Sequence, residues 1–345
     1  MVTVSAPGKC IMIGEHAVVY GEPAIIAAIS KRTTVTCTKD AKVRYFDTRF
    51  DTEGNVWNVA DVLSSARNTL HLWETCTSAK NFSPLFEHIK KNRYAEYRKA
   101  VVGIALLRLG VRDGVSVEIR SDVPVGSGVG SSSSLSVALT KAIALTFKKD
   151  LTPADINSIA YDLEKIIHGT PSGGDNSASC YGGLLWFKKT ADGPSIQSLK
   201  EEVPYKLENF VLVYTTQPTK TTGELVQLVR NAPEPAKTTH IKAIGTASLR
   251  MRKALAKKDM QTVRDCMNEA QQHLASLGVS TPEIDHIARA VRDMAGAAKL
   301  CGAGGGGIML CYHHEKQKLV SALKKLGYDP FETDLGVEGV RVENA

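Results

Sequence analysis

The sequence predicts a two-domain α+β protein, and three observations support this prediction. A chain of 345 residues is too long for one ordinary hydrophobic core and suits two domains. Segments with the alternation of a strand and segments with the spacing of a helix follow one another along the chain. A glycine-rich run at residues 124–134 joins one such strand to one such helix. We expect the domains to span residues 1–190 and 191–345, with a polar stretch near the boundary.

Three strands and two helices are predicted in the N-terminal part. The strands are residues 2–5, 31–38 and 115–119, the last with Val115, Val117 and Ile119 in alternation. A helix follows the glycine-rich run, because apolar residues from Leu135 to Ile143 recur at spacings of three and four. Thr152-Pro-Ala-Asp155 has the sequence of a helix start, and this second helix ends at Gly169. Residues 70–100 are polar and mixed in charge, and we expect a helical insertion or a lid there.

The remaining elements are predicted by the same patterns. Leu184–Phe187 is expected to be a buried strand, and Phe210–Tyr214 begins the second domain. Helices are expected at 240–257, at 260–275 and after Thr281-Pro282, and strands at 299–301 and 308–312. The glycine run 302–307 lies between these two strands, where a tight hairpin would explain it without a ligand.

The glycine-rich run from Pro124 to Ser134 has the features of a phosphate-binding loop. Gly126, Gly128 and Gly130 let the backbone approach an anion, which the free amides and the dipole of the helix start would attract. The spacing is G-x-G-x-G and no lysine follows, so the run is neither a Walker A loop nor the dinucleotide fingerprint. The alternative is a flexible loop with a serine N-cap, but three glycines and four serines are more than a cap requires.

Several charged residues have both a functional and a structural interpretation. Glu164 lies at the border of a helix's apolar stripe, either as a solvated edge residue or as a Mg²⁺ ligand opposite a serine of 131–134. Asp175, in Gly-Gly-Asp-Asn, is explained by turn chemistry alone. Lys9, Glu15 and His16 have apolar flanks, where charges are costly unless they are paired or used.

Composition excludes several functional classes. The net charge of +7 is spread along the chain without a basic block, which argues against nucleic acid as a partner. The apolar stretches are too short to span a bilayer, and the N-terminus has no apolar signal core. Seven cysteines without paired or zinc-type spacing indicate reduced thiols and a cytoplasmic protein.

Three motifs together resemble the GHMP small-molecule kinases. They are Pro7-Gly-Lys with Gly14-Glu-His, then Pro124-x-Gly-Ser-Gly-x-Gly-Ser-Ser, then Gly302-Ala-Gly-Gly-Gly-Gly. The stretches 14–21, 167–176 and 277–280 are similar to the members that phosphorylate mevalonate, and the compact length resembles the archaeal and bacterial ones among them. The resemblance implies a GHMP kinase fold, with an N-terminal α/β nucleotide-binding domain, a ferredoxin-like C-terminal domain and the active site between them.

The activity that this resemblance implies is transfer of the γ-phosphoryl group of ATP to the C5 hydroxyl of mevalonate, in isoprenoid biosynthesis. Such a kinase binds ATP, Mg²⁺ and mevalonate, and a homodimer is left open. Asp175 and Lys9 would be catalytic, Ser132 and Glu164 would hold Mg²⁺, and Glu15, His16 and Thr222 would bind mevalonate. The residues implied to bind ATP are those of the loop: Gly126, Ser127, Gly128, Val129, Gly130, Ser131 and Ser132.

Two other functions stay open from the sequence. One is a different kinase of this family, acting at another hydroxyl of mevalonate or on a sugar. The other is an inactive relative that binds a ligand as a sensor, although the presence of Lys9, Glu164 and Asp175 argues against it. Ser133 and Ser134 replace a usual small apolar pair, so the resemblance does not decide which serine of 131–134 binds Mg²⁺.

Overall fold

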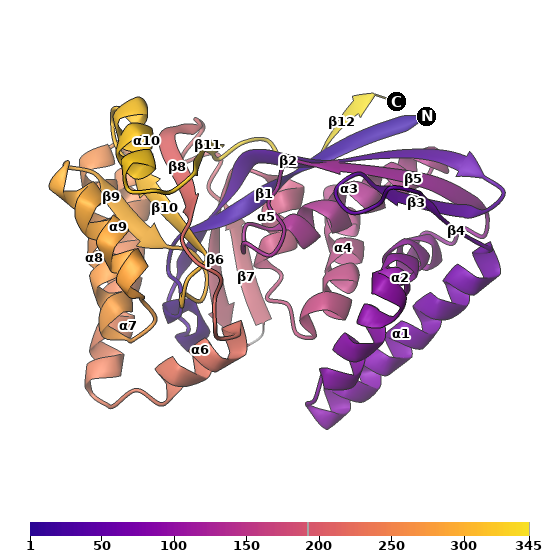
Figure 1. Cartoon of the computed structure of the whole chain (residues 1–345), viewed down its shortest axis with the longest axis horizontal. Helices are drawn as coiled ribbons and strands as arrows, with labels where there is room; N and C mark the ends of the chain where they lie inside the picture. Colours follow the sequence, from indigo (N-terminus) through magenta and orange to yellow (C-terminus); the bar gives the residue numbers. More distant parts are fainter. Residues whose placement is uncertain (192, 345) are drawn as a thin grey trace.

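A twelve-stranded sheet runs through the computed structural model, which describes residues 1–191 and 193–344. The main path of the sheet has the order β4-β3-β5-β2-β11-β8-β10-β9, and it passes from one half of the molecule to the other where β11 meets β2 (Figure 1). The elements of the first half are β1 (Val2–Ile13), the 3₁₀ helix η1 (Ala17–Tyr20), β2 (Ala24–Asp40), β3 (Val43–Asp47), β4 (Asn55–Trp57), α1 (Val59–Ala79), α2 (Ser83–Arg108), β5 (Gly114–Ser121), α3 (Ser131–Thr146), α4 (Pro153–His168), α5 (Gly174–Tyr181), β6 (Leu184–Thr190) and β7 (Gly193–Ser198).

The second half has the strand order of a ferredoxin-like domain, as the family resemblance implies. Strands β8, β9, β10 and β11 lie in the order β11-β8-β10-β9, and their neighbours are antiparallel. Helices α7, α8 and α9 lie on one side of this sheet in Figure 1. The elements are β8 (Leu207–Tyr214), α6 (Thr222–Arg230), α7 (Ala236–Ala256), α8 (Met260–Ser276), α9 (Pro282–Asp293), β9 (Ala297–Leu300), β10 (Ile308–Tyr312), α10 (Lys316–Lys325), β11 (Pro330–Leu335) and β12 (Arg341–Asn344).

The long strands β1 and β2 exceed their predicted lengths. Residues 24–29 of β2 are all apolar and all buried, so this part of the strand has no polar alternation by which it could be recognised. β1 pairs with β2 from Val2 to Ile13 and with β12 on its other edge. The two chain ends therefore lie side by side (Figure 1). The domain boundary at residue 190 stays a prediction.

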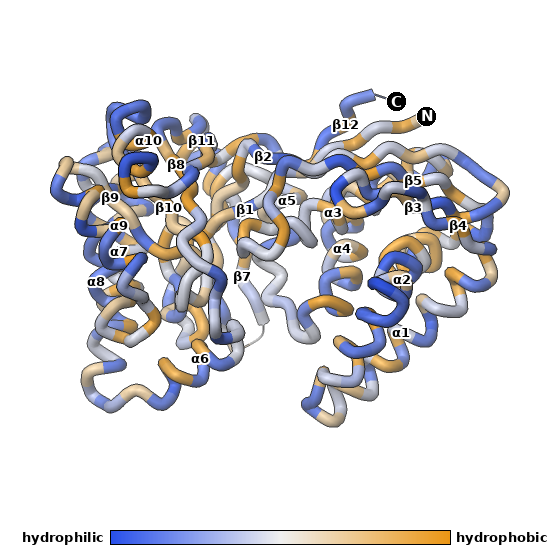
Figure 2. The backbone as a smooth tube through the Cα atoms, in the orientation of Figure 1, coloured by the Kyte–Doolittle hydropathy of each residue, from blue (hydrophilic) through white to orange (hydrophobic). Residues whose placement is uncertain are grey.

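Local sequence signals place most helices correctly. The Thr152 side chain caps α4 in a capping box with Asp155, and the Thr281 side chain accepts a hydrogen bond from the Ile284 amide. The insertion expected at 70–100 is helical and consists of α1 and α2, with a non-helical break at Lys91–Tyr94. Blue and orange segments alternate along the outer helices in Figure 2, as expected for helices with one buried face.

One local interpretation was wrong, and one strand had no prediction. Asp175 does not lie in a turn but in the first turn of α5, which begins at Gly174. The polar stretch near 190–208 contains the edge strand β7, which pairs with β6 and keeps mostly exposed side chains. Neither element has the apolar periodicity that a sequence pattern requires. Within the described residues, every helix is too short or too polar to cross a membrane.

Candidate active site

The glycine-rich loop connects β5 to α3, as predicted, and it is anchored to β1. The Lys9 amide donates a hydrogen bond to the Val129 carbonyl at 2.9 Å. Gly130 has φ +80°, and a Cβ there would lie 2.8 Å from Lys9 Cγ, so the close contact between loop and strand requires glycine. α3 begins at Ser131 and is sixteen residues long, so its unpaired amides and its dipole face the loop.

Ser132 and Glu164 form the candidate metal site. Glu164 is buried on α4, and its carboxylate accepts from Ser132 Oγ at 3.0 Å and from Ser136 Oγ at 2.9 Å. It is therefore not a solvated helix edge. Mg²⁺ prefers oxygen ligands and takes one or two from protein, with phosphates and water for the rest. A hydroxyl and a carboxylate at the start of a phosphate-type loop fit that requirement.

The other serines of the run are already engaged within the protein. Ser133 Oγ is hydrogen-bonded to Gly130 O and Ser179 Oγ, and Ser134 Oγ lies 2.7 Å from Thr33 Oγ1. Both side chains are fully buried. Among the serines of 131–134, Ser132 is thus the one that contacts Glu164.

Lys9 and Asp175 form an ion pair across the loop from this site. Lys9 Nζ lies 3.0 Å from Asp175 Oδ2, with the lysine side chain buried and the aspartate side chain 36% exposed. Burial by itself would lower the pKa of Lys9, but the charge and hydrogen bond of Asp175 outweigh burial and raise that pKa above its usual value. Lys9 is therefore an ammonium at neutral pH, beside a carboxylate that solvent and a ligand can reach.

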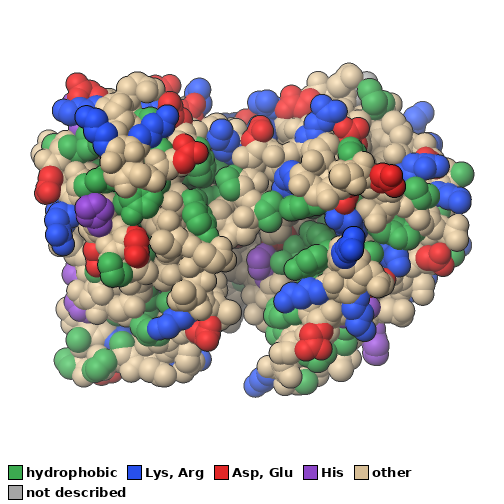
Figure 3. All heavy atoms as spheres, in the orientation of Figure 1, with side chains coloured by type: hydrophobic (Ala, Val, Ile, Leu, Met, Phe, Trp, Pro, Cys, Tyr) green, Lys and Arg blue, Asp and Glu red, His purple; other side chains and the backbone are tan. Residues whose placement is uncertain are grey.

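One cavity of about 700 Å³ is lined by Ser132 and Asp175, whereas their partners Glu164 and Lys9 are buried and do not line it. Its lining also includes aromatic and arginine side chains from β3, the residues after it and α2, together with Gly126, Gly128, Gly130 and Ser131 of the loop and helix start. The volume lies within the range of small-molecule and cofactor sites. Figure 3 shows the surface hollowed between the two halves, with hydrophobic and basic side chains beside the hollow.

Glu15 and His16 lie elsewhere, at the end of β1. The Glu15 carboxylate is buried in an ion pair with Lys299 of β9, and its Oε2 atom accepts no hydrogen bond from the described residues. Burial raises the pKa of Glu15 above its usual value although Lys299 opposes the shift. His16 Nε2 lies 2.8 Å from the Ala303 carbonyl, so Nε2 carries the proton and Nδ1 is left as an acceptor. Burial lowers the pKa of His16, which keeps the ring neutral.

The structure does not bring every predicted site residue to the cavity. Thr222 is the exposed first residue of α6 and does not line the cavity, nor do Glu15 and His16. Two loop residues turn their side chains away: Ser127 Oγ donates to Pro124 O, and Val129 is fully buried. These two can offer a ligand only their backbone.

Comparison with known proteins assigns the family. The family model for the GHMP kinases N terminal domain matches residues 96–183, and the model for the GHMP kinases C terminal domain matches residues 251–329. The mevalonate kinase of Thermococcus sibiricus is 31% identical to this chain, over 99% of the chain and 98% of its own length. The chain belongs to the GHMP kinase family. Mevalonate kinases of Pyrococcus horikoshii and Candida albicans are 32% and 30% identical, over 99% and 98% of this chain and 98% and 89% of their own lengths.

Solved structures agree with this assignment. The Methanococcus jannaschii mevalonate kinase superposes with a TM-score of 0.79 at 26% identity, covering 97% of this chain and 98% of that one. Another mevalonate kinase structure gives a TM-score of 0.80 at 25% identity, covering 98% of this chain and all of that one. The two-domain α+β fold predicted from the sequence is thus confirmed as the GHMP kinase fold.

Sequence reasoning missed two polar residues at the cavity of this GHMP kinase. Arg49 Nη1 donates to Ser131 Oγ at 3.1 Å, and Asp47 holds the guanidinium through two of its other nitrogens. No motif marks this arginine. His168 Nε2 lies 3.2 Å from Ser132 Oγ. It follows Glu164 by four residues on one helix, and that spacing could have identified it.

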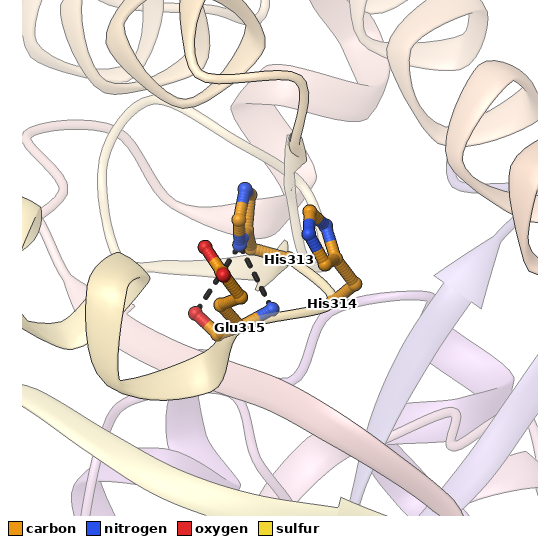
Figure 4. Close-up of side chains that lie close together, drawn as sticks. All are labelled: His313, His314 and Glu315. Atoms are coloured by element: carbon orange, nitrogen blue, oxygen red, sulfur yellow. Dashed lines mark hydrogen bonds between the residues drawn. The ribbon is translucent and has the colours of Figure 1, made fainter.

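A second cluster of potential metal ligands is structural. His313, His314 and Glu315 lie close together after β10 (Figure 4). His313 is buried, however, and both of its ring nitrogens are engaged. Nδ1 accepts from the Glu315 amide at 3.0 Å, and Nε2 lies 2.9 Å from the Met294 carbonyl. His313 thus fixes the turn before α10 and has no nitrogen free for a cation.

Proposed function

We propose that this protein is a mevalonate kinase, which transfers the γ-phosphoryl group of ATP to the C5 hydroxyl of mevalonate. One observation carries the proposal: the glycine-rich loop, Ser132 and Asp175 line one cavity, with buried Glu164 bonded to Ser132 and buried Lys9 paired with Asp175. That arrangement offers phosphate-binding amides, a metal site and an acid–base group within one volume. The full-length relatives named mevalonate kinase support mevalonate as the acceptor.

The loop and the start of α3 would bind the phosphates. Their backbone amides replace water around the anionic oxygens, and Gly126, Gly128 and Gly130 leave space for that approach. Ser132 and Glu164 would hold Mg²⁺, which neutralises phosphate charge when bound. Phosphoryl transfer passes through a loose transition state, so positioning and charge neutralisation supply most of the catalysis.

Asp175 would orient the attacking hydroxyl and accept its proton. Its side chain is partly exposed to the cavity, and Lys9 keeps a positive charge 3.0 Å away. The ammonium would offset negative charge that develops on the transferred group. His16 Nδ1 is the free acceptor of its ring and would accept from a mevalonate hydroxyl, whereas Glu15 Oε2 is buried and the Glu15 carboxylate is held by Lys299. All seven cysteines are free and buried, which supports a reducing compartment such as the cytoplasm.

The proposal is tested by ADP release in a coupled assay with mevalonate, phosphomevalonate and galactose as acceptors. We expect turnover with mevalonate and a far lower kcat/KM with the other two. The position of the new phosphate is read by ³¹P–¹H correlation in NMR. It shows whether the C5 hydroxyl or the other hydroxyl of mevalonate has been phosphorylated. Preference for galactose would assign another GHMP kinase activity, and binding without turnover would favour the inactive sensor.

A further inference from the structure

Three ligand-type atoms converge beside the phosphate-binding loop. Ser132 Oγ and Glu164 Oε2 are 3.0 Å apart, and His168 Nε2 lies 3.2 Å from the first and 3.4 Å from the second. The three atoms form a nearly regular triangle. Two come from α4 and one from the first turn of α3, so the triangle depends on the packing of these helices.

The size of this triangle matches one face of a metal coordination sphere. Divalent cations such as Mg²⁺ bind in an octahedron at 2.0–2.1 Å, and adjacent ligands in such a site are about 3 Å apart. A chain of hydrogen bonds through three atoms would need only two short contacts. Here all three interatomic distances are close to the separation of adjacent ligands in an octahedral site. One cation could therefore contact all three atoms after a small adjustment.

The surroundings hold the buried Glu164 carboxylate in place beside two groups that line the cavity. Ser136 Oγ donates to Glu164 Oε1, which fixes the carboxylate and leaves Oε2 for the triangle. Glu164 and His168 are one helical turn apart and lie on the same face of α4. Ser132 and His168 both line the cavity, and the His168 side chain is 47% exposed, so the ring is open on that side.

We propose that His168 Nε2 is a third protein ligand of the catalytic cation, together with Ser132 Oγ and Glu164 Oε2. The three occupy one face of the coordination sphere, and nucleotide phosphates and water take the opposite face. The inference rests on the proposed use of a metal–ATP complex but is independent of which acceptor is phosphorylated. It adds a nitrogen to a site that otherwise offers only oxygen.

A nitrogen ligand changes which cations the site favours. Carboxylate, hydroxyl and water suit Mg²⁺ and Mn²⁺, whereas imidazole suits Ni²⁺ and other later transition metals. If His168 is a ligand, its removal weakens Ni²⁺ binding more than Mg²⁺ binding. If His168 only orients Glu164 by a hydrogen bond, its removal weakens both by a similar factor.

The decisive experiment is pulsed electron paramagnetic resonance of Mn²⁺ bound to the full-length protein with a non-hydrolysable β,γ-methylene analogue of ATP. We expect electron spin-echo modulation from a directly bound ¹⁴N, replaced by ¹⁵N coupling when the protein carries ¹⁵N-histidine. This labelling identifies a histidine ligand without any substitution. Absence of nitrogen coupling, or coupling that the labelling leaves unchanged, would overturn the proposal.

Substitutions then assign the histidine. His168→Gln keeps a polar group of similar reach and should abolish the coupling, while His286→Gln, at an exposed position of α9, should retain it. Calorimetric titration with the same nucleotide should show that His168→Gln weakens Ni²⁺ binding by about tenfold or more relative to Mg²⁺. Coupling that persists in His168→Gln, or equal losses for both metals, contradicts direct ligation. Mevalonate is absent from these measurements, so a wrong acceptor assignment does not affect their outcome.

Discussion

Replacement of Asp175 by asparagine tests the centre of the proposed mechanism. Asparagine has nearly the shape of aspartate, but it carries no charge and cannot accept a proton from the substrate hydroxyl. In the structure the Asp175 carboxylate is paired with the buried Lys9 ammonium at 3.0 Å and is 36% exposed. The substitution therefore removes both the proposed base and the partner of Lys9.

The expected loss of rate is much larger than the expected loss of stability. A positioned acid–base group contributes roughly 10²–10⁴ in rate, or about 3–5 kcal/mol of transition-state stabilisation. Breaking this partly exposed pair should cost an unfolding free energy between two limits. An exposed ion pair contributes about 1 kcal/mol, and breaking a buried pair costs about 3 kcal/mol. A domain that is stable by about 5–15 kcal/mol stays folded after such a loss. We expect kcat to fall by roughly two to four orders of magnitude, with nucleotide affinity nearly unchanged.

The assay is coupled ADP release at saturating ATP and mevalonate, together with thermal unfolding and binding of an ATP analogue. Glu269→Gln is the matched control, because it breaks the ion pair with Arg250 between α7 and α8, which is remote from the cavity. It should leave kcat unchanged. An Asp175→Asn variant with near-normal kcat would refute the acid–base role and make the Lys9–Asp175 pair structural.

Four further predictions follow from the same geometry. Glu164→Gln should raise the Mg²⁺ concentration for half-maximal rate at saturating ATP; an unchanged metal dependence would contradict its role as a ligand. His16→Ala should raise KM for mevalonate well above its effect on KM for ATP, whereas equal effects would mean that His16 is structural. Gly130→Ala places a Cβ 2.8 Å from Lys9 Cγ at φ +80°, so thermal unfolding should show a loss of about 1–3 kcal/mol; no loss would mean that the loop relaxes. The pKa of Lys9 is raised above 10.5, so its stabilisation is complete below pH 10.5 and is lost as pH rises through the folded-state value. The unfolding free-energy difference between the unmodified protein and Lys9→Met should accordingly be constant from about pH 7 to 9 and shrink above about pH 10.5, and a decline already near pH 8 would exclude a raised pKa.

Much of the fold was predictable because local signals depend on neighbouring residues. The capping box at Thr152, the strand before the glycine-rich loop and the helical stripe of α3 each involve hydrogen bonds or spacings within a few residues. The first half of β2 was not predictable in this way, because a continuous apolar run carries no periodicity. The edge strand β7 was missed for the opposite reason, since its exposed residues show no buried face.

The sequence by itself determined which chemical groups this protein can use: a glycine-rich loop before a helix, a serine run, and a few carboxylates and cations with apolar neighbours. Only the tertiary structure decided which of them meet. Lys9 reaches Asp175 because β1 passes beneath the loop, and Glu15 is paired with Lys299 of a distant strand. Such pairs join segments far apart in the chain, and their geometry depends on how whole elements pack. Periodicity, capping and turn patterns extend over only a few residues and therefore contain no information about these contacts.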